Sequence, residues 1–166
     1  MSKVYDDPKY NAAFDRCVDV MARLLQAEGW RCDVVFVLGS ELSPLAETNR
    51  RRLLNLAGIS FIGVQALPAQ LAQQRYDVLI EGIFGTGFAG RLPAEVAACC
   101  RLLNASDGLK VALDMPTGLN GDTGDVDADV FRAELTYTFG AYKPAHIMDA
   151  GRAVCGEIVC LDIGIQ

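Results

Sequence analysis

Two carboxylates and one hydroxyl fall where predicted strands end. Glu81 lies near the end of an apolar run over residues 78–84. Asp114 closes a second run, residues 110–114, and Thr117 follows it after a proline turn. Because the carboxyl ends of parallel strands meet at one edge of a sheet, we expect these side chains to share a crevice there. Paired carboxylates serve acid–base catalysis or hold a cation, whereas the structural alternative is capping and turn stabilisation.

A glycine-rich segment, residues 85–90 (GTGFAG), matches the GxGxxG pattern of dinucleotide-binding turns. It follows one predicted strand and precedes a predicted helix, and Asp114 ends the next strand. Three features disfavour a classical dehydrogenase: the motif lies in mid-chain, Pro93 delays the helix, and no second domain remains to hold a hydride acceptor. Two interpretations stay open: a turn whose backbone N–H groups face a ligand, and a turn with only steric causes.

Other polar motifs favour structural interpretations. His146, the only histidine, can serve as an acid or base, but a lone histidine is more often structural. The acidic loop at residues 120–129 lacks the residue types that a calcium-binding EF-hand loop requires, so its carboxylates are assigned to turns. The cysteines show no zinc or CxxC spacing, which favours burial over disulfides or metal binding: Cys17, Cys32, Cys99, Cys100, Cys155 and Cys160.

Strand-like and helical patterns alternate along most of the chain. Short apolar runs predict strands at residues 3–5, 32–38, 59–64, 78–84, 110–114, 135–139 and 157–161. Helical spacing, with proline near each start, predicts helices at residues 8–28, 44–57, 68–74 and 93–103. A long loop is expected at residues 115–129 and a turn region at residues 143–144. The alternation predicts an α/β fold, a three-layer Rossmann-like sandwich with a mostly parallel central sheet, as one domain over residues 1–166.

The ligand site of such a sheet lies beyond the carboxyl ends of its strands. In this sequence those ends are residues 38–40, 81–91, 114–119 and the region of Lys143. Topology therefore predicts where the site lies, and the residue types at these ends must supply its chemistry.

Composition restricts the class of protein. Of 166 residues, 51% are hydrophobic and 22% charged, which is typical of a globular domain. The net charge of −6 disfavours nucleic acid as a partner, because a phosphate backbone requires a basic surface. No apolar run approaches the roughly 20 residues of a membrane helix, and the N-terminus lacks a signal-peptide core, so a cytoplasmic location is expected.

Several longer motifs occur in one order along the second half of the chain. They are DVLIEGIFGTGF (77–88), VALDMPTGL (111–119), DTG (122–124), TFGAYKP (138–144), GR (151–152) and CGEIVCLDIG (155–164). Together these motifs resemble the NAD(P)H-hydrate epimerase family, the YjeF N-terminal domain. The resemblance runs from about Val20 to Ile165 and is dense in the second half.

The resemblance implies an activity and a set of site residues. The reaction would be interconversion of the R and S epimers of hydrated NADH or NADPH, a repair step, with a small-molecule substrate and no tightly bound organic cofactor. Asp114 would be the catalytic carboxylate. Glu81, where the family usually has Asp, and Thr117 would coordinate a potassium ion. The substrate-binding loop would be Gly85, Thr86, Gly87, Phe88, Ala89, Gly90 and Arg91.

The N-terminus departs from the family. Where the family has a first strand followed by an Asn-Asn-Gly-Gly-Asp loop, this chain reads DDPKYN at residues 6–11. Proline removes a backbone donor and acids repel an anion, so the phosphate-binding loop is missing. Three functions stay open: a divergent epimerase, an enzyme that uses Asp114 on a less phosphorylated small molecule, and a catalytically silent domain for binding or assembly.

The first predicted strand, residues 3–5, is also shorter than the usual 5–6 or so residues. A sheet built around such a short strand leaves pairing positions open. We therefore expect a homo-oligomer, or a different partner chain that completes the sheet.

Overall fold

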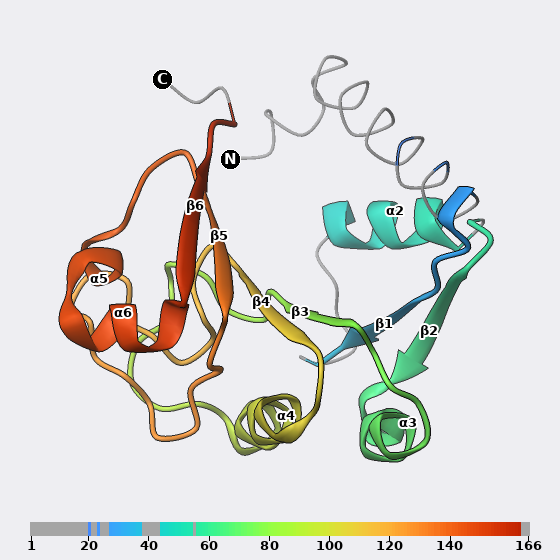
Figure 1. Cartoon of the computed structure of the whole chain (residues 1–166), viewed down its shortest axis with the longest axis horizontal. Helices are drawn as coiled ribbons and strands as arrows, with labels where there is room; N and C mark the ends of the chain where they lie inside the picture. Colours follow the sequence, from blue (N-terminus) through green and yellow to red (C-terminus); the bar gives the residue numbers. More distant parts are fainter. Residues whose placement is uncertain (1–19, 21–22, 24–26, 38–43, 55, 164–166) are drawn as a thin grey trace. The chain divides into compact units, whose positions relative to one another are not determined.

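The computed structural model describes residues 20, 23, 27–37, 44–54 and 56–163 (Figure 1). The chain divides into two compact units, Met1–Leu67 and Pro68–Gln166, which we describe separately. Several predictions fall outside the described residues: the strand at residues 3–5, the segment 6–11 and the strand end at residues 38–40. Of the predicted helix at residues 8–28, the structure describes only residues 20, 23, 27 and 28.

The first unit contains a βαβ arrangement. Its strands β1 (Cys32–Phe36) and β2 (Ile59–Gly63) pair in parallel, and α2 (Pro44–Leu53) lies between them in sequence. A crossover of this kind is what two parallel strands require. The helix ends at Leu53, several residues before the predicted end at residue 57.

The second unit contains a four-stranded parallel sheet with the order β3-β4-β5-β6 (Figure 1). Its strands are β3 (Val78–Glu81), β4 (Leu109–Leu113), β5 (Leu135–Phe139) and β6 (Glu157–Leu161). The predicted bounds of β5 and β6 are confirmed. β3 ends at Glu81 instead of residue 84, because the chain turns there. The parallel strands and intervening helices confirm the predicted α/β class.

Helices connect the strands of this unit. A short 3-10 helix η1 (Val64–Ala66) runs into α3 (Leu67–Gln73), and α4 (Ala94–Ala105) joins β3 to β4. Both α-helices agree with the prediction to within two residues at their ends. Two further helices, α5 (Pro144–Ile147) and α6 (Asp149–Cys155), precede β6 and contact each other.

The prediction of a turn region at residues 143–144 was wrong, because α5 begins there. Pro144 occupies the first helical position, where its missing N–H costs nothing. Met148 has extended backbone angles, so α5 and α6 stay separate helices. Gly156, with φ of 62°, then ends α6 and allows the chain to enter β6.

One face of β3 is buried and the other is exposed. Leu79 and Glu81 are buried, whereas Val78 and Ile80 on the opposite face are exposed, Ile80 by 63%. Alternation of this kind follows from the two-residue period of a strand. Glu81 is therefore a carboxylate on the core side of the sheet, an unusual place for an acid.

The predicted loop after Asp114 is confirmed, but its interior is part of the core. Met115 and Leu119 are fully buried and belong to a hydrophobic cluster with side chains from α5 and α6. An isolated antiparallel bridge joins Leu119 to Val126. Because these apolar side chains are packed, the loop holds the residues at its start in a fixed position.

Burial, as predicted, accounts for three of the five described cysteines, whereas Cys32 and Cys160 are half-buried. Cys99, Cys100 and Cys155 are buried, and burial raises the pKa of the Cys100 thiol to about 12 and that of Cys155 to about 11. Neither is a thiolate at neutral pH. The free cysteines among the described residues are Cys32, Cys99, Cys100, Cys155 and Cys160. Cys17 lies outside those residues.

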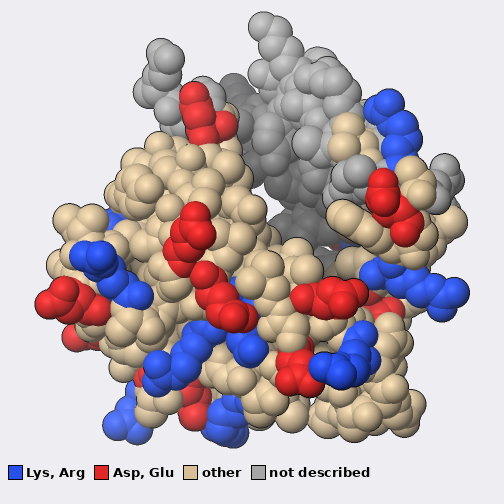
Figure 2. Space-filling view, viewed as in Figure 1, with Lys and Arg blue, Asp and Glu red and all other residues tan. Residues whose placement is uncertain are grey.

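The distribution of surface charge and the length of the helices can be compared with what nucleic-acid and membrane partners require. Figure 2 shows acidic and basic side chains interspersed over the face in view. Among the described residues, no helix combines the length and apolar character needed to cross a membrane.

Candidate functional site

Asp114 has a left-handed backbone conformation directly after β4. Its φ is 69°, and among the described residues it is the one non-glycine residue with a positive φ. Its N–H donates to the carbonyl of Tyr137 on β5 at 2.7 Å, which secures the turn. Aspartate tolerates this conformation better than most residues, but it still costs energy. Strain of this kind concentrates at functional sites.

The Asp114 carboxylate is held through one of its two oxygens. Lys143 Nζ forms an ion pair with Oδ1, and the Phe139 N–H donates to the same oxygen at 3.3 Å. The Thr138 hydroxyl lies 3.3 Å from Oδ1 as well. All hydrogen bonds to this carboxylate from described residues reach Oδ1. No hydrogen bond from a described residue reaches Oδ2.

Gly85 faces that second oxygen. A Cβ atom added to Gly85 would lie 3.4 Å from Asp114 Oδ2, whereas one added to Gly87 would meet nothing within 4 Å. A turn closes here, in which the Phe88 N–H donates to the Gly85 carbonyl at 3.3 Å. The Phe84 and Phe88 rings stack with centroids 5.6 Å apart, which anchors the segment. The predicted loop therefore lies beside the predicted carboxylate.

The remainder of the predicted substrate loop is open to solvent. Phe88 is buried and Gly85 is half-buried, and the other loop residues are exposed: Thr86, Gly87, Ala89, Gly90 and Arg91. Exposed backbone groups at the carboxyl edge of a sheet are available to a ligand.

Glu81 and Thr117 form a buried pair, as the sequence predicts for two strand ends at one edge. The Thr117 N–H donates to Glu81 Oε1 at 2.9 Å and its hydroxyl donates to Oε2 at 2.7 Å. The Ile83 N–H adds a third bond, to Oε2, at 3.1 Å. Burial raises the pKa of Glu81, and the hydrogen bonds from Thr117 and Ile83 oppose that effect.

The donor chemistry of this pair fits a hard cation. The Phe84 carbonyl oxygen lies 3.4 Å from the Thr117 hydroxyl, so a carboxylate, a hydroxyl and a carbonyl meet in one place. Oxygen ligands of these three types are those that hard cations prefer. A bound cation would also offset the cost of burying the Glu81 charge.

His146 lies beneath Lys143 and is 2% exposed. Its Nδ1 accepts the backbone N–H of Lys143 at 3.1 Å, and its Nε2 is buried without a hydrogen-bond partner among the described residues. Burial and the Lys143 charge lower the pKa of His146, and the carbonyl and carboxylate of Asp114 act in the opposite direction. A neutral imidazole that supports a backbone segment agrees with the structural interpretation.

The acidic loop carries out the predicted turn role. Asn120 Oδ1 accepts the N–H groups of Asp122 and Thr123 at 2.9 and 3.0 Å. The Thr123 hydroxyl donates to Asp125 Oδ2 at 2.7 Å. Asp127 accepts the Leu92 N–H at 3.1 Å, which ties this loop to the start of α4. These are turn carboxylates, as expected.

Lys143 and Thr138 are the site residues that the sequence analysis did not select. The region of Lys143 was named there only as the end of a predicted strand. Thr138 was named only as the first residue of the motif TFGAYKP. The signal for both was their position at the carboxyl end of β5, next to the strand that ends at Asp114.

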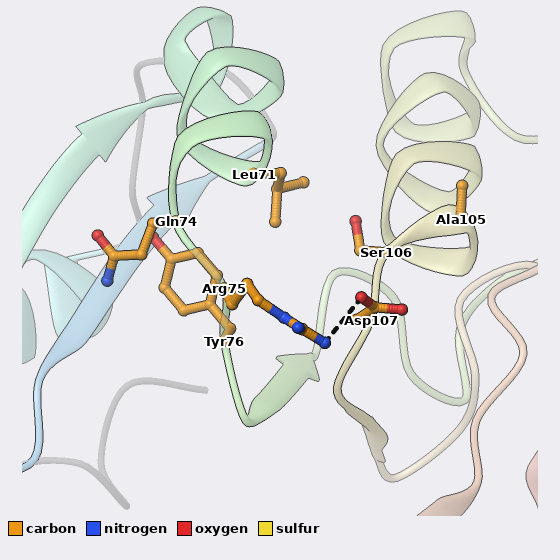
Figure 3. A pocket seen from close by; sticks show the side chains of 7 residues that line it. All are labelled: Leu71, Gln74, Arg75, Tyr76, Ala105, Ser106 and Asp107. Atoms are coloured by element: carbon orange, nitrogen blue, oxygen red, sulfur yellow. Dashed lines mark hydrogen bonds and ion pairs between the residues drawn. The ribbon is translucent and has the colours of Figure 1, made fainter.

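A surface pocket lies elsewhere on the second unit (Figure 3). It is formed by residues at the ends of α3 and α4, which precede β3 and β4, and thus lies at the amino ends of the strands. Arg75 and Asp107 form an ion pair there at 3.0 Å, with both side chains largely exposed. Exposed pairs of this kind contribute little. The residues that line it are Leu71, Gln74, Arg75, Tyr76, Ala105, Ser106 and Asp107.

Comparison with known proteins identifies relatives. The bifunctional NAD(P)H-hydrate repair enzyme Nnr of Archaeoglobus fulgidus is 43% identical over 131 residues, which is 79% of this chain and 26% of that protein. The NAD(P)H-hydrate epimerase of Weissella koreensis is 31% identical over 145 residues, 87% of this chain and 63% of that protein. The chain thus spans less than two thirds of either relative.

A solved structure and a family model complete the comparison. The crystal structure of yeast ynu0 (YNL200c) superposes with a TM-score of 0.63 at 18% identity, covering 86% of this chain and 58% of that one. This likeness confirms the Rossmann-like α/β fold. The family described as YjeF-related protein N-terminus matches residues 19–145. The chain therefore belongs to this family, and the resemblance seen in its sequence motifs is confirmed.

Proposed function

We propose that this chain interconverts the R and S epimers of hydrated NADH or NADPH, with Asp114 as the proton-transfer group. The observation that carries the proposal is the Asp114 carboxylate, held through Oδ1 by Lys143 while Oδ2 faces Gly85. The names of the relatives from Archaeoglobus fulgidus and Weissella koreensis support this choice of substrate.

The chemistry requires one proton to be given and one to be taken. Water adds to an enamine at the carbon next to nitrogen, so the hydrated carbon carries a hydroxyl beside the ring nitrogen. Its C–O bond breaks with the electron pair going to oxygen, which takes the proton that the Asp114 carboxyl group carries on Oδ2 in this step, the oxygen not held by Lys143, and leaves as water. The nitrogen lone pair forms the C=N bond of an iminium. Water then adds to the opposite face of the iminium, and a second water carries the proton that it releases back to Asp114 Oδ2.

The residues 85–91 loop would hold the substrate in this proposal. Its glycine at position 85 leaves space in front of Asp114 Oδ2, and its exposed backbone can contact the ring and the pyrophosphate. Contacts of this kind would fix the hydrated carbon near the carboxyl group, where proximity contributes to the rate.

The direct test is an exchange assay on both epimers of hydrated NADPH. Asp114→Asn keeps a residue type that tolerates the left-handed backbone and removes the acid. We expect it to slow exchange by roughly 10²- to 10⁴-fold. Asp122→Asn, in an exposed turn of the next loop, is the matched control and should exchange at the wild-type rate. Wild-type protein that does not accelerate exchange would overturn the proposal, as would full activity of Asp114→Asn.

We also propose that Glu81 and Thr117 hold a potassium ion. When bound, the ion supplies a positive charge that favours an anionic substrate and balances the buried Glu81 carboxylate. Potassium chloride should raise the melting temperature of wild type above that in equal sodium chloride, and Thr117→Ser should keep this response. Thr117→Val lacks the hydroxyl and should lose the difference between the salts. Equal melting temperatures of wild type in both salts would contradict the site.

An enzyme acting on a less phosphorylated small molecule is the second candidate. The observation that favours it is the sequence DDPKYN at residues 6–11, where the family has its glycine-rich loop. In that case the two epimers of hydrated reduced nicotinamide mononucleotide should interconvert faster than those of hydrated NADPH. Binding of a metabolite without turnover would instead favour the silent binding domain.

We further propose a cytoplasmic protein that forms a homo-oligomer. The exposed apolar side chains of β3, Val78 and Ile80, support association, because an apolar sheet face is normally covered. Sedimentation at micromolar concentration should give a species larger than the monomer, and a monomer would contradict this.

A further inference from the structure

The ammonium group of Lys143 donates hydrogen bonds to three acceptors within the protein. Nζ contacts Asp114 Oδ1, the Thr138 hydroxyl at 2.7 Å and the Phe139 carbonyl at 3.1 Å. A lysine ammonium has three N–H donors, so each can have an acceptor. The side chain is only 18% exposed. Lys143 is therefore a fixed cation with its donors committed, and not a group that exchanges protons with a substrate.

The same contacts determine the orientation of the Asp114 carboxylate group. Oδ1 interacts with Lys143 and the Phe139 N–H, while no described residue donates to Oδ2. A carboxylate with one oxygen in an ion pair and the other free is limited in rotation about its last bond. The free oxygen faces Gly85, the side on which the substrate loop lies.

The backbone of Lys143 is held as firmly as its side chain. Its N–H donates to Nδ1 of the buried His146 at 3.1 Å. Two residues later, the Ala145 N–H donates to the Gly121 carbonyl at 2.9 Å. Gly121 in turn lies against the backbone of Thr86, in the substrate loop. This arrangement fixes the start of α5 against the loops on both sides of Asp114.

We propose that Lys143 is the positioning residue of the site, which directs Asp114 Oδ2 at the substrate by holding Oδ1. The expected effect of Lys143 on the reaction rate rests on the proposed epimerase function. The expected effect of Lys143 on the orientation of the Asp114 carboxylate rests on the geometry alone. Lys143 acts through Asp114 and does not touch the reacting atoms.

The kinetic test compares Lys143→Met with Lys110→Met. Lys110 lies at the other end of the sheet, on β4, and its Nζ contacts only the Gly108 carbonyl among the described residues. Loss of a charge-assisted hydrogen bond predicts a fall in kcat of roughly 10- to 100-fold for Lys143→Met with little change in KM. Lys110→Met should match wild type. Methylammonium should restore part of the activity of Lys143→Ala, which a purely structural role would not allow.

A double-mutant cycle makes the kinetic test specific. In the Asp114→Asn background, Lys143→Met should have little further effect, because the residue acts through that carboxylate. A full additive loss, or no rescue by methylammonium, would overturn the inference.

A structural test works even if the wild-type chain has no epimerase activity. In a crystal structure of Lys143→Met, the Asp114 carboxylate should rotate so that Oδ2 no longer faces Gly85, whereas Lys110→Met should leave it in place. An unmoved Asp114 carboxylate would overturn the positioning role. An inactive wild type with a rotated carboxylate in Lys143→Met would overturn the proposed function and support the inference.

Discussion

Replacing Gly85 with alanine tests the geometry of the site with a single methyl group. The new Cβ would lie 3.4 Å from Asp114 Oδ2 and 3.9 Å from Asp114 Cβ, both ordinary contact distances. Gly85 does not have a positive φ, so alanine fits its backbone without strain. The protein should therefore fold normally. Alanine lowers the entropy of the unfolded chain, so the free energy of unfolding should change by less than about 1 kcal/mol.

The same methyl group occupies the approach to the reactive oxygen. A proton-transfer partner must come within roughly 2.6–3.2 Å of Oδ2, which is closer than the methyl itself. A substrate kept away by about 1 Å loses on the order of 10²-fold in rate. We expect Gly85→Ala to reduce epimer exchange by that factor while its melting temperature stays near that of wild type.

Gly63→Ala, on β2 and outside the substrate loop, is the matched control, because a Cβ there meets only the Gln65 side chain, at an ordinary 3.5 Å. Both variants are assayed for epimer exchange and for thermal unfolding. Normal exchange by Gly85→Ala would refute the assignment of Oδ2 as the reacting oxygen. An equal loss in Gly63→Ala would show that exchange responds to an added methyl far from Oδ2, which would also refute it.

Three further predictions concern stability. Gly156→Ala should lower the free energy of unfolding by more than about 2 kcal/mol, because its Cβ would lie 2.2 Å from the Glu134 carbonyl oxygen at a φ of 62°. Gly140→Ala is the control, since its φ of 73° is similar but its nearest neighbour lies at 3.9 Å. In denaturant unfolding, Gly140→Ala should lose clearly less stability than Gly156→Ala. Asn104→Ala should cost about 1–3 kcal/mol in the same measurement, because two backbone groups of the loop before β5 lose their partner. The lowered pKa of His146 means that the unfolded chain takes up a proton first, so stability should fall as pH drops below 6.5; in His146→Asn this contribution should vanish, and an unchanged pH dependence from pH 7 to 5 would contradict it.

Local patterns predicted the sheet well. β5 and β6 have the bounds expected from their apolar runs, and each run is bordered by residues that end a strand. The helices α5 and α6 were missed because elements of 4 and 7 residues are too short to show a helical period. Their apolar side chains serve one packed cluster, which no local window can show.

The candidate site was predictable only in part. Asp114, Glu81 and Thr117 were selected because each follows or ends a strand, and the structure brings Glu81 and Thr117 into direct contact. Lys143 lies 29 residues from Asp114, and their ion pair depends on β4 and β5 being neighbours. Pairing of two strands is a long-range property, so spacing along the chain cannot reveal it.

The left-handed backbone of Asp114 has a genetic consequence. The residue types that adopt this conformation at least cost are glycine, asparagine and aspartate. The codons of asparagine and glycine each differ from an aspartate codon at one base. A single mutation can therefore remove the acid and leave the turn, the sheet and the neighbouring loops intact. Catalysis at this position can be lost in one step without selection against misfolding, so folded but silent descendants of such a domain should arise readily.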